Sequence, residues 1–276
     1  MSKPDSSYSA ARVTSSADGD FASRSAARLE QIQSQLQAKP RGNRLKGKVC
    51  IITGVGSIAG IGRAAALQFA REGAAHLYLI DFDPTNLPDL KSTIEQKYPD
   101  VKATTLAADA ADEAAISGVC KQALQEEGRL DVFFANAGIA TQEPLQNTTA
   151  ESFMNTLRIN TLSCFLAVKH GSEAMLKTNP SRGKDLSSGS IIMTASVAGL
   201  RSGAGTVDYV CIPLQKTDIR VNAVCPGLIE TGMTTGIFNF ARSKGAGAKI
   251  GQLNPMGRYG IADEIANVVT FLASGT

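Results

Sequence analysis

The sequence is poor in the residues that build metal and disulfide sites. Its 276 residues include no tryptophan, two histidines and five cysteines. No two cysteines have CxxC spacing, and neither His76 nor His170 is close to a cysteine pair, so we expect no metal site. The odd number of cysteines also argues against a disulfide framework. Three cysteines lie in apolar runs and are expected to be reduced, buried thiols of an intracellular protein: Cys50, Cys164 and Cys225.

Long apolar runs and a strong net charge are also absent. No stretch approaches the ~20 apolar residues that span a bilayer, and the N-terminus lacks the charged-then-apolar pattern of a signal peptide. Arg12 and Arg24 among serines and alanines suggest a transit peptide, but Asp5, Asp18 and Asp20 argue against one. A net charge of +3 is too small to indicate a nucleic-acid or membrane partner. We therefore expect a cytoplasmic protein with neither kind of partner.

The composition is that of an ordinary globular protein, with 43% hydrophobic and 19% charged residues. Residues 1–44 are predicted to be a polar N-terminal extension. Within it, residues 1–23 show no pattern, whereas Leu29, Ile32 and Leu36 recur at helical spacing and predict a short amphipathic helix over residues 25–39. A Pro-Arg-Gly-Asn sequence then ends this helix. Residues 45–276 are predicted to form one domain.

Apolar runs alternate with helical patterns through this domain. Short continuous apolar runs are typical of strands that are buried on both faces. The alternation predicts an α/β fold, a doubly wound parallel sheet of six or seven strands with helices on both faces. The strands are expected at residues 49–53, 77–81, 103–107, 132–134, 189–194 and 220–224, and the helices at 63–73, 86–97, 113–127, 150–177 and 264–273.

A glycine-rich segment joins the first strand to the first helix of this domain. Glycines let the backbone turn tightly and approach a pyrophosphate, and the following helix presents free N–H groups to its charge. Two registers fit: Gly54, Gly60 and Gly62 as the three key glycines, or Gly54 and Gly56 followed by Ala59. Either register predicts a dinucleotide site after an apolar strand.

An acidic residue ends the second strand. Asp81 follows Gly54 by 27 residues, and a carboxylate there can accept hydrogen bonds from the ribose hydroxyls of the adenosine. The same carboxylate would repel a 2′-phosphate, so NAD is favoured as the cofactor and NADP is disfavoured. Asp83 competes for this role but is better placed to cap the turn.

Together with further motifs along the chain, these residues make the sequence resemble the short-chain dehydrogenase/reductase family over roughly residues 45–276. Tyr209 follows Ser196 by 13 residues, as the family pattern expects. The resemblance rests on a set of motifs in the family's order: Thr53-Gly54, Gly60-Ile61-Gly62, Asp109, Asn136-Ala137-Gly138, Asn160, Ser196, Tyr209 and Pro226-Gly227-Leu228-Ile229-Glu230-Thr231. It implies hydride exchange between NAD and a small-molecule alcohol or ketone.

The resemblance also implies a role for each motif. Asn136 and Gly138 would support the central strand and the adenine side of the cofactor, and Asp109 would lie at the adenine. Ile229 and Thr231 would meet the nicotinamide carboxamide. In the catalytic set, Tyr209 would exchange the proton, Ser196 would hydrogen-bond the substrate oxygen, and Asn160 would hold a water in a proton relay. Each has a plainer alternative: a core tyrosine, a strand-end hydroxyl and an amide that kinks a helix.

The chain departs from the family pattern at the catalytic lysine. The family has lysine four residues after the tyrosine, where this chain has Pro213. A tyrosine has a pKa near 10, and a lysine ~4.5 Å away would lower it by about 2–3 units. Lys216 is ~10 Å along a helix from Tyr209, against ~6 Å for a spacing of four. The alternative function is therefore a non-catalytic or impaired dinucleotide-binding protein.

The second half of the domain differs in length as well. Arg220 follows Tyr209 by only eleven residues, so we predict a mostly extended loop over residues 210–218. The family expects one more strand after residue 276, so the domain is expected to be C-terminally incomplete and the strand at residues 220–224 to be an exposed edge. The shortened helix is a common subunit interface in the family, which leaves a homo-oligomer open. Residues 232–254 would cap a hydrophobic substrate or form a surface loop.

Overall fold

Six segments of the chain form the strands of one parallel sheet. The computed structural model describes residues 15–38, 40–140, 145–197, 217–252, 254 and 256–275. Within these residues the sheet has the order β3-β2-β1-β4-β5-β6, and every neighbouring pair is parallel. The strands are β1 (Val49–Thr53), β2 (His76–Asp81), β3 (Lys102–Ala107), β4 (Val132–Ala135), β5 (Ser188–Thr194) and β6 (Asp218–Val224).

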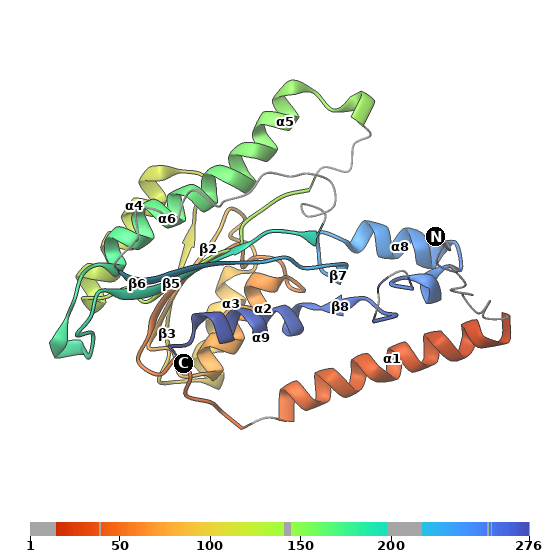
Figure 1. Cartoon of the computed structure of the whole chain (residues 1–276), viewed down its shortest axis with the longest axis horizontal. Helices are drawn as coiled ribbons and strands as arrows, with labels where there is room; N and C mark the ends of the chain where they lie inside the picture. The colour runs from red at the N-terminus through yellow and green to blue at the C-terminus, as the bar shows by residue number, and fades with distance from the viewer. Residues whose placement is uncertain are drawn as a thin grey trace, which may run out of the picture. The chain divides into compact units, whose positions relative to one another are not determined.

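Helices cover both faces of this sheet, as the sequence predicts (Figure 1). One face packs against α2 (Ile61–Arg71), α3 (Leu87–Lys97) and α9 (Ala262–Ala273). The other packs against α4 (Glu113–Glu127) and α6 (Ser163–Met175), and α6 continues α5 (Ala150–Leu157) through a π-helical turn, Arg158–Leu162. The predicted doubly wound fold is confirmed.

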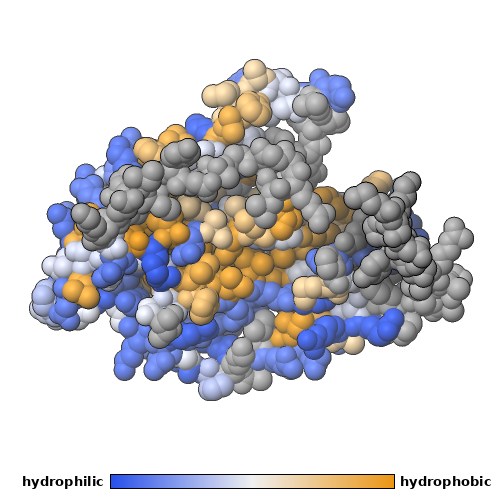
Figure 2. Space-filling view, in the orientation of Figure 1, coloured by the Kyte–Doolittle hydropathy of each residue, from blue (hydrophilic) through white to orange (hydrophobic). Residues whose placement is uncertain are grey.

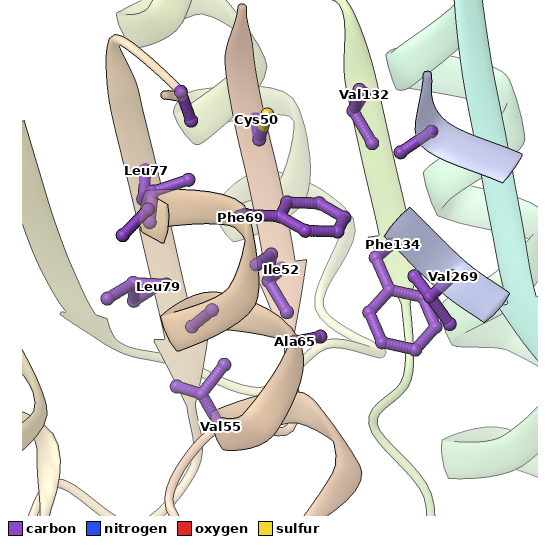
Figure 3. Close-up of a cluster of buried hydrophobic side chains, with 14 of the residues drawn as sticks. Cys50, Ile52, Val55, Ala65, Phe69, Leu77, Leu79, Val132, Phe134 and Val269 are labelled. Carbon is purple, nitrogen blue, oxygen red and sulfur yellow. The ribbon is translucent and has the colours of Figure 1, made fainter. Parts of the chain in front are cut away.

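Side chains of β1 show why both faces need a helical layer. Cys50 and Ile52 point into the core with α2 and α9, whereas Val49 and Ile51 point into the core with α4 and α6. Figure 3 shows the first of these cores, where Phe69 of α2 lies over β1 and β2, and Val269 of α9 lies near Phe134 of β4. A strand buried on both sides is apolar at every position, which is why the sequence shows continuous runs instead of alternation.

The described residues divide into two units. The sheet and its helices belong to the larger unit, residues 39–235 with 260–276, which also holds the short strands β7 (Ile229–Glu230) and β8 (Gly260–Ile261) and the 3-10 helices Leu145–Asn147 and Pro180–Arg182. The smaller unit combines α1 (Ser15–Ala38) with residues 236–259, most of α8 (Thr235–Ser243) and the 3-10 helix Gly247–Lys249. Its Phe238 ring meets Tyr259 edge to face, with centroids 4.8 Å apart.

The N-terminal helix is longer than the sequence pattern suggests. The prediction of a helix over residues 25–39 and no pattern before it is wrong at the N-terminal side, because α1 begins at Ser15. The added turns contain few apolar residues, so they lack the helical spacing on which the prediction depends. They contain alanines, the best helix formers.

Other expectations have mixed outcomes. Residues 235–243 form a helix, α8, so the predicted alternative of a surface loop over residues 232–254 is wrong there. Cys50 is buried as expected, whereas Cys164 and Cys225 are only partly buried. In the described residues β6 is an edge of the sheet. The predicted loop lies outside the described residues except at its last two positions, where β6 begins at Asp218.

Candidate functional site

Two cavities adjoin at the carboxyl ends of the strands. The strand order reverses between β1 and β4, and this switch point is where doubly wound sheets bind ligands. One cavity, of about 550 Å³, extends from the glycine loop to the segments that follow β5 and β6. The other, of about 410 Å³, lies over the ends of β2 and β3. Gly54, Asp81 and Gly138 line both, so the two form a continuous groove of the size that small-molecule sites have.

The glycine loop enters this groove with its backbone exposed. Gly54 has a left-handed φ of +74°, and a Cβ on Gly62 would overlap the Gly54 carbonyl oxygen. Gly60 is the N-cap of α2, and no side chain caps the first N–H groups of that helix. Gly60 and Ile61 line the larger cavity. These positions match the register of Gly54, Gly60 and Gly62, and the two extra residues of the loop lie in an exposed turn.

Asp81 ends β2 with its carboxylate held at the groove. Its Oδ2 accepts a hydrogen bond from Gly56 N at 2.7 Å, and its Oδ1 accepts one from Asp83 N at 2.9 Å. Asp83 instead accepts bonds from the backbone and hydroxyl of Thr85, which lower the pKa of its fully exposed carboxyl. Asp83 therefore caps the turn, as the sequence predicts.

Asn136 joins the ends of three strands. Its Nδ2 donates to the carbonyls of Thr53 and Gly54, and its Oδ1 accepts a bond from the Thr194 hydroxyl at 2.9 Å. The buried Thr53 hydroxyl accepts bonds from Asn136 N and Ala137 N, both at 3.0 Å. The side chain thus ties β1, β4 and β5 together beneath the larger cavity. Thr53 and Thr194 were not singled out for this role in the sequence, because a threonine at a strand end carries no distinctive signal.

Asp109 lies in the smaller cavity and is paired. Its Oδ1 accepts a bond from Ala111 N at 2.8 Å and its Oδ2 accepts one from Arg158 Nη1 at 2.7 Å. Burial raises the pKa of the Asp109 carboxyl, but the two hydrogen bonds and the guanidinium charge outweigh it and lower the pKa overall. Phe82, 79% exposed, lines the same cavity. No motif or spacing in the sequence singles out Arg158.

Asn160 lies in the π-helical turn between α5 and α6. Its Oδ1 accepts a hydrogen bond from Ile139 N at 2.8 Å, and its Nδ2 donates to Ile139 O at 2.9 Å. The side chain therefore holds the backbone that follows Gly138. A π turn within an α-helix is rare and is frequent at functional sites. The structure thus places Asn160 in a helix distortion, and its role in a proton relay stays a prediction.

The remaining site residues lie around the larger cavity. Ser196 follows β5 and lines the cavity, and its neighbours Ala195 and Val197 donate backbone bonds to Val224 O and Pro226 O. Ile229 and Thr231 line it as well. The hydroxyl of Thr234 organises this loop, since it donates to Ile229 O and accepts from Thr231 N. Tyr209, Pro213 and Lys216 lie outside the described residues.

A group of potential metal ligands lies at the other end of the sheet. His76, Glu126 and Glu127 bring three ligand atoms within 4.8 Å of one another. The His76 ring is engaged on both sides, by Glu127 at 2.9 Å and Thr104 at 2.8 Å, and Lys102 lies 3.4 Å from Glu127. Arg182 also lies 3.4 Å from Glu127, so two protein cations already pair with this carboxylate. None of the described helices is both long and apolar enough to cross a membrane.

Comparisons with known proteins agree with this geometry. A family model described as enoyl-(acyl carrier protein) reductase matches residues 54–276. Levodione reductase of Leifsonia aquatica is 36% identical over 248 residues, 84% of this chain and 89% of that protein. The chain belongs to the short-chain dehydrogenase/reductase family.

Solved structures show the same likeness. Carveol dehydrogenase from Mycobacterium avium, in complex with NAD, has a TM-score of 0.71 at 27% identity, over 84% of this chain and 93% of that one. An NAD+-bound xylitol dehydrogenase has a TM-score of 0.68 at 29% identity, over 83% and 92%. This short-chain family member is an oxidoreductase that exchanges a hydride between a nicotinamide dinucleotide and an alcohol or ketone, and the alternative of a non-catalytic binding protein is not favoured.

Proposed function

We propose that this family member uses NAD in preference to NADP and acts on a secondary alcohol or the matching ketone. The observation that carries the cofactor preference is the Asp81 carboxylate. It lies in the groove where both cavities meet, and two backbone N–H groups hold it in place. A carboxylate there favours ribose hydroxyls and disfavours a 2′-phosphate.

The groove fits an extended dinucleotide. The uncapped start of α2, with Gly60, Ile61 and Gly62, would receive the pyrophosphate, because free N–H groups and the helix dipole favour negative charge. Asp109 would hold the adenine end and Gly138 and Asn136 would form the floor. Ile229 and Thr231 would bind the nicotinamide carboxamide at the other end.

The catalytic residues would act at the nicotinamide end. The bound cofactor accepts or supplies the hydride, and the protein must move the accompanying proton. Tyr209 would take the proton of the alcohol, and Ser196 would hydrogen-bond the alcohol oxygen. Asn160, whose side chain holds Ile139, would keep the groove floor in place and hold the relay water. Because no lysine stands at position 213, we expect Tyr209 to act best at alkaline pH.

Cofactor binding tests the preference without a known substrate. We would measure Kd for NADH and NADPH by nucleotide fluorescence for the wild type, Asp81→Asn and Asp83→Asn. A 2′-phosphate of charge about −1.5 to −2 roughly 5 Å from a carboxylate is disfavoured by about 2.5–3.3 kcal/mol at an effective dielectric of ~40, or roughly 70- to 300-fold in Kd. We expect Asp81→Asn to remove most of that discrimination.

Asp83→Asn is the matched control, since Asp83 lies two residues away and is fully exposed. It should change the ratio of the two Kd values less than threefold. Equal ratios for the wild type and Asp81→Asn would contradict the proposed role of Asp81, and a larger effect of Asp83→Asn would transfer that role to Asp83. Failure of the wild type to bind either nucleotide would contradict the proposed function itself.

We also propose a homo-oligomer and a cytoplasmic location. Large apolar side chains are exposed along α5 and α6, among them Phe153, Met154 and Phe165, and Figure 2 shows apolar surface on α5 at the top of the view. Exposed apolar patches are typical of protein interfaces. Light scattering after size exclusion tests the assembly: a wild-type mass of about 29 kDa would contradict it.

A further inference from the structure

Arg158 lines the smaller cavity and pairs there with Asp109. It is the first residue of the π turn Arg158–Leu162, which also carries Asn160. Its guanidinium donates to Asp109 Oδ2 at 2.7 Å and to Asn155 Oδ1 at 3.4 Å. Asn155, Arg158 and Ile159 all line the smaller cavity with Asp109. One turn of helix therefore carries both Arg158, which pairs with Asp109, and Asn160, which holds Ile139.

The ion pair between Arg158 and Asp109 spans 49 positions of the chain and links two elements that no strand pairing joins. Asp109 lies in the loop between β3 and α4, and Arg158 lies between α5 and α6. In the described residues the Arg158 guanidinium is the cation that Asp109 contacts. A carboxylate has about four acceptor positions, so Asp109 bonded to Ala111 N and Arg158 can still receive a ligand donor.

The second link is the Asn160 amide. Both of its polar atoms bond the backbone of Ile139, which lines the smaller cavity. A π turn has lost the regular i→i−4 bonding of an α-helix, so its register depends more on side-chain contacts at its ends. At the N-terminal end, the contact is the pair of Arg158 with Asp109.

We propose that Arg158 is a positioning residue that fixes the register of the π turn by pairing with Asp109. Through Asn160, the π turn then holds the Gly138–Ile139 backbone in the conformation that binds the cofactor. The role rests on the proposed function for its ligand, the adenine nucleotide. It does not require Arg158 to contact the reacting atoms.

Amide exchange of Ile139 tests this role in the full chain without any ligand. The Ile139 N–H is protected by Asn160 Oδ1, so loss of the Arg158 contact should expose it more often. We expect Arg158→Gln to speed its exchange about two- to fivefold, the range of a partly exposed ion pair. The Ile139 exchange rate of Arg158→Lys should lie between those of Arg158→Gln and the wild type, because lysine keeps the charge and loses the bond to Asn155.

Lys169→Gln is the matched control. Lys169 lies on the continuing helix α6 and pairs with Glu113 at 2.6 Å, with side-chain exposure similar to that of Arg158, 49% against 43%. The Lys169→Gln substitution should leave the Ile139 exchange rate unchanged. Unchanged exchange in Arg158→Gln, or an equal increase in Lys169→Gln, would overturn the positioning role.

Binding of AMP supplies the second measurement. By calorimetry, Arg158→Gln should raise the Kd for AMP about two- to fivefold, and Asp109→Asn combined with Arg158→Gln should raise Ile139 exchange no further than either variant alone. Additive effects of the two substitutions would overturn the proposed pairing. If the wild type binds neither AMP nor NADH, the proposed cofactor function fails, whereas the exchange comparison still decides the role of Arg158.

Discussion

Thr53 is a residue whose hydroxyl can be removed almost without a change of shape. It ends β1, is 2% exposed, and its Oγ1 accepts hydrogen bonds from Asn136 N and Ala137 N, both at 3.0 Å. Thr53→Val replaces the hydroxyl by a methyl group and leaves two N–H donors without their acceptor. Each orphaned donor costs about 1–3 kcal/mol when water cannot reach it.

The two donors lie in partly buried residues, so water can compensate some of the loss. We therefore expect Thr53→Val to lower the free energy of unfolding by about 2–4 kcal/mol, which lowers Tm by roughly 5–15 °C in a protein of this size. The same bonds hold the junction of Gly54 and Asn136, so we also expect NADH to bind about tenfold more weakly.

Urea unfolding followed by circular dichroism measures the stability, and nucleotide fluorescence measures the Kd. Thr53→Ser is the control, because it keeps the acceptor oxygen and loses one methyl group; it should cost about 1 kcal/mol. Neutral substitutions change the free energy of unfolding by up to about 0.5 kcal/mol. If Thr53→Val changes it by no more than that, the two amides have other partners. If Thr53→Ser is as destabilising as Thr53→Val, packing of the methyl group matters instead of the hydrogen bonds.

Three further predictions follow from the packing, the catalytic set and a buried histidine. Gly62→Ala should weaken NADH binding and lower the free energy of unfolding by about 1–3 kcal/mol, because its Cβ would overlap the Gly54 carbonyl oxygen. Gly118→Ala is the control, since a Cβ there meets nothing within 4 Å. Urea unfolding should show that it stabilises α4 by about 0.5–1 kcal/mol. Alcohol oxidation should rise with pH toward the ordinary tyrosine pKa of ~10, and Tyr209→Phe should lower kcat at least ~100-fold; a plateau near pH 7 would contradict this. Burial lowers the pKa of His76. Its contribution to stability is therefore present above the unfolded pKa of ~6.5 and is lost as pH falls through the folded pKa. Urea unfolding at pH 7.5 and 5.5 should show a smaller difference in the free energy of unfolding between the two pH values for His76→Asn than for the wild type.

The sequence predicts the elements of the sheet well and the N-terminal helix less well. Strands such as Val49–Thr53 are apolar up to their last residue because two helical layers cover them, so their pattern is strong. The first turns of α1 have no such layer to dictate apolar spacing, and the predicted helix begins ten residues too late. Of the candidate site, the sequence pattern predicts the glycine loop and Asp81, whereas the family resemblance implies Asn136 and Asp109.

By itself the sequence determined the fold class, the order of the strands and helices, and the family motifs, because each depends on periodicity or on residues close together in the chain. Only the tertiary structure decided which glycine register meets α2, that Thr53 and Thr194 serve Asn136, and that Arg158 pairs with Asp109. The hydrogen bonds among these contacts join residues 49 to 83 positions apart. Hydrogen bonds between such distant residues depend on where the sheet brings the strand ends, and no local pattern encodes that position.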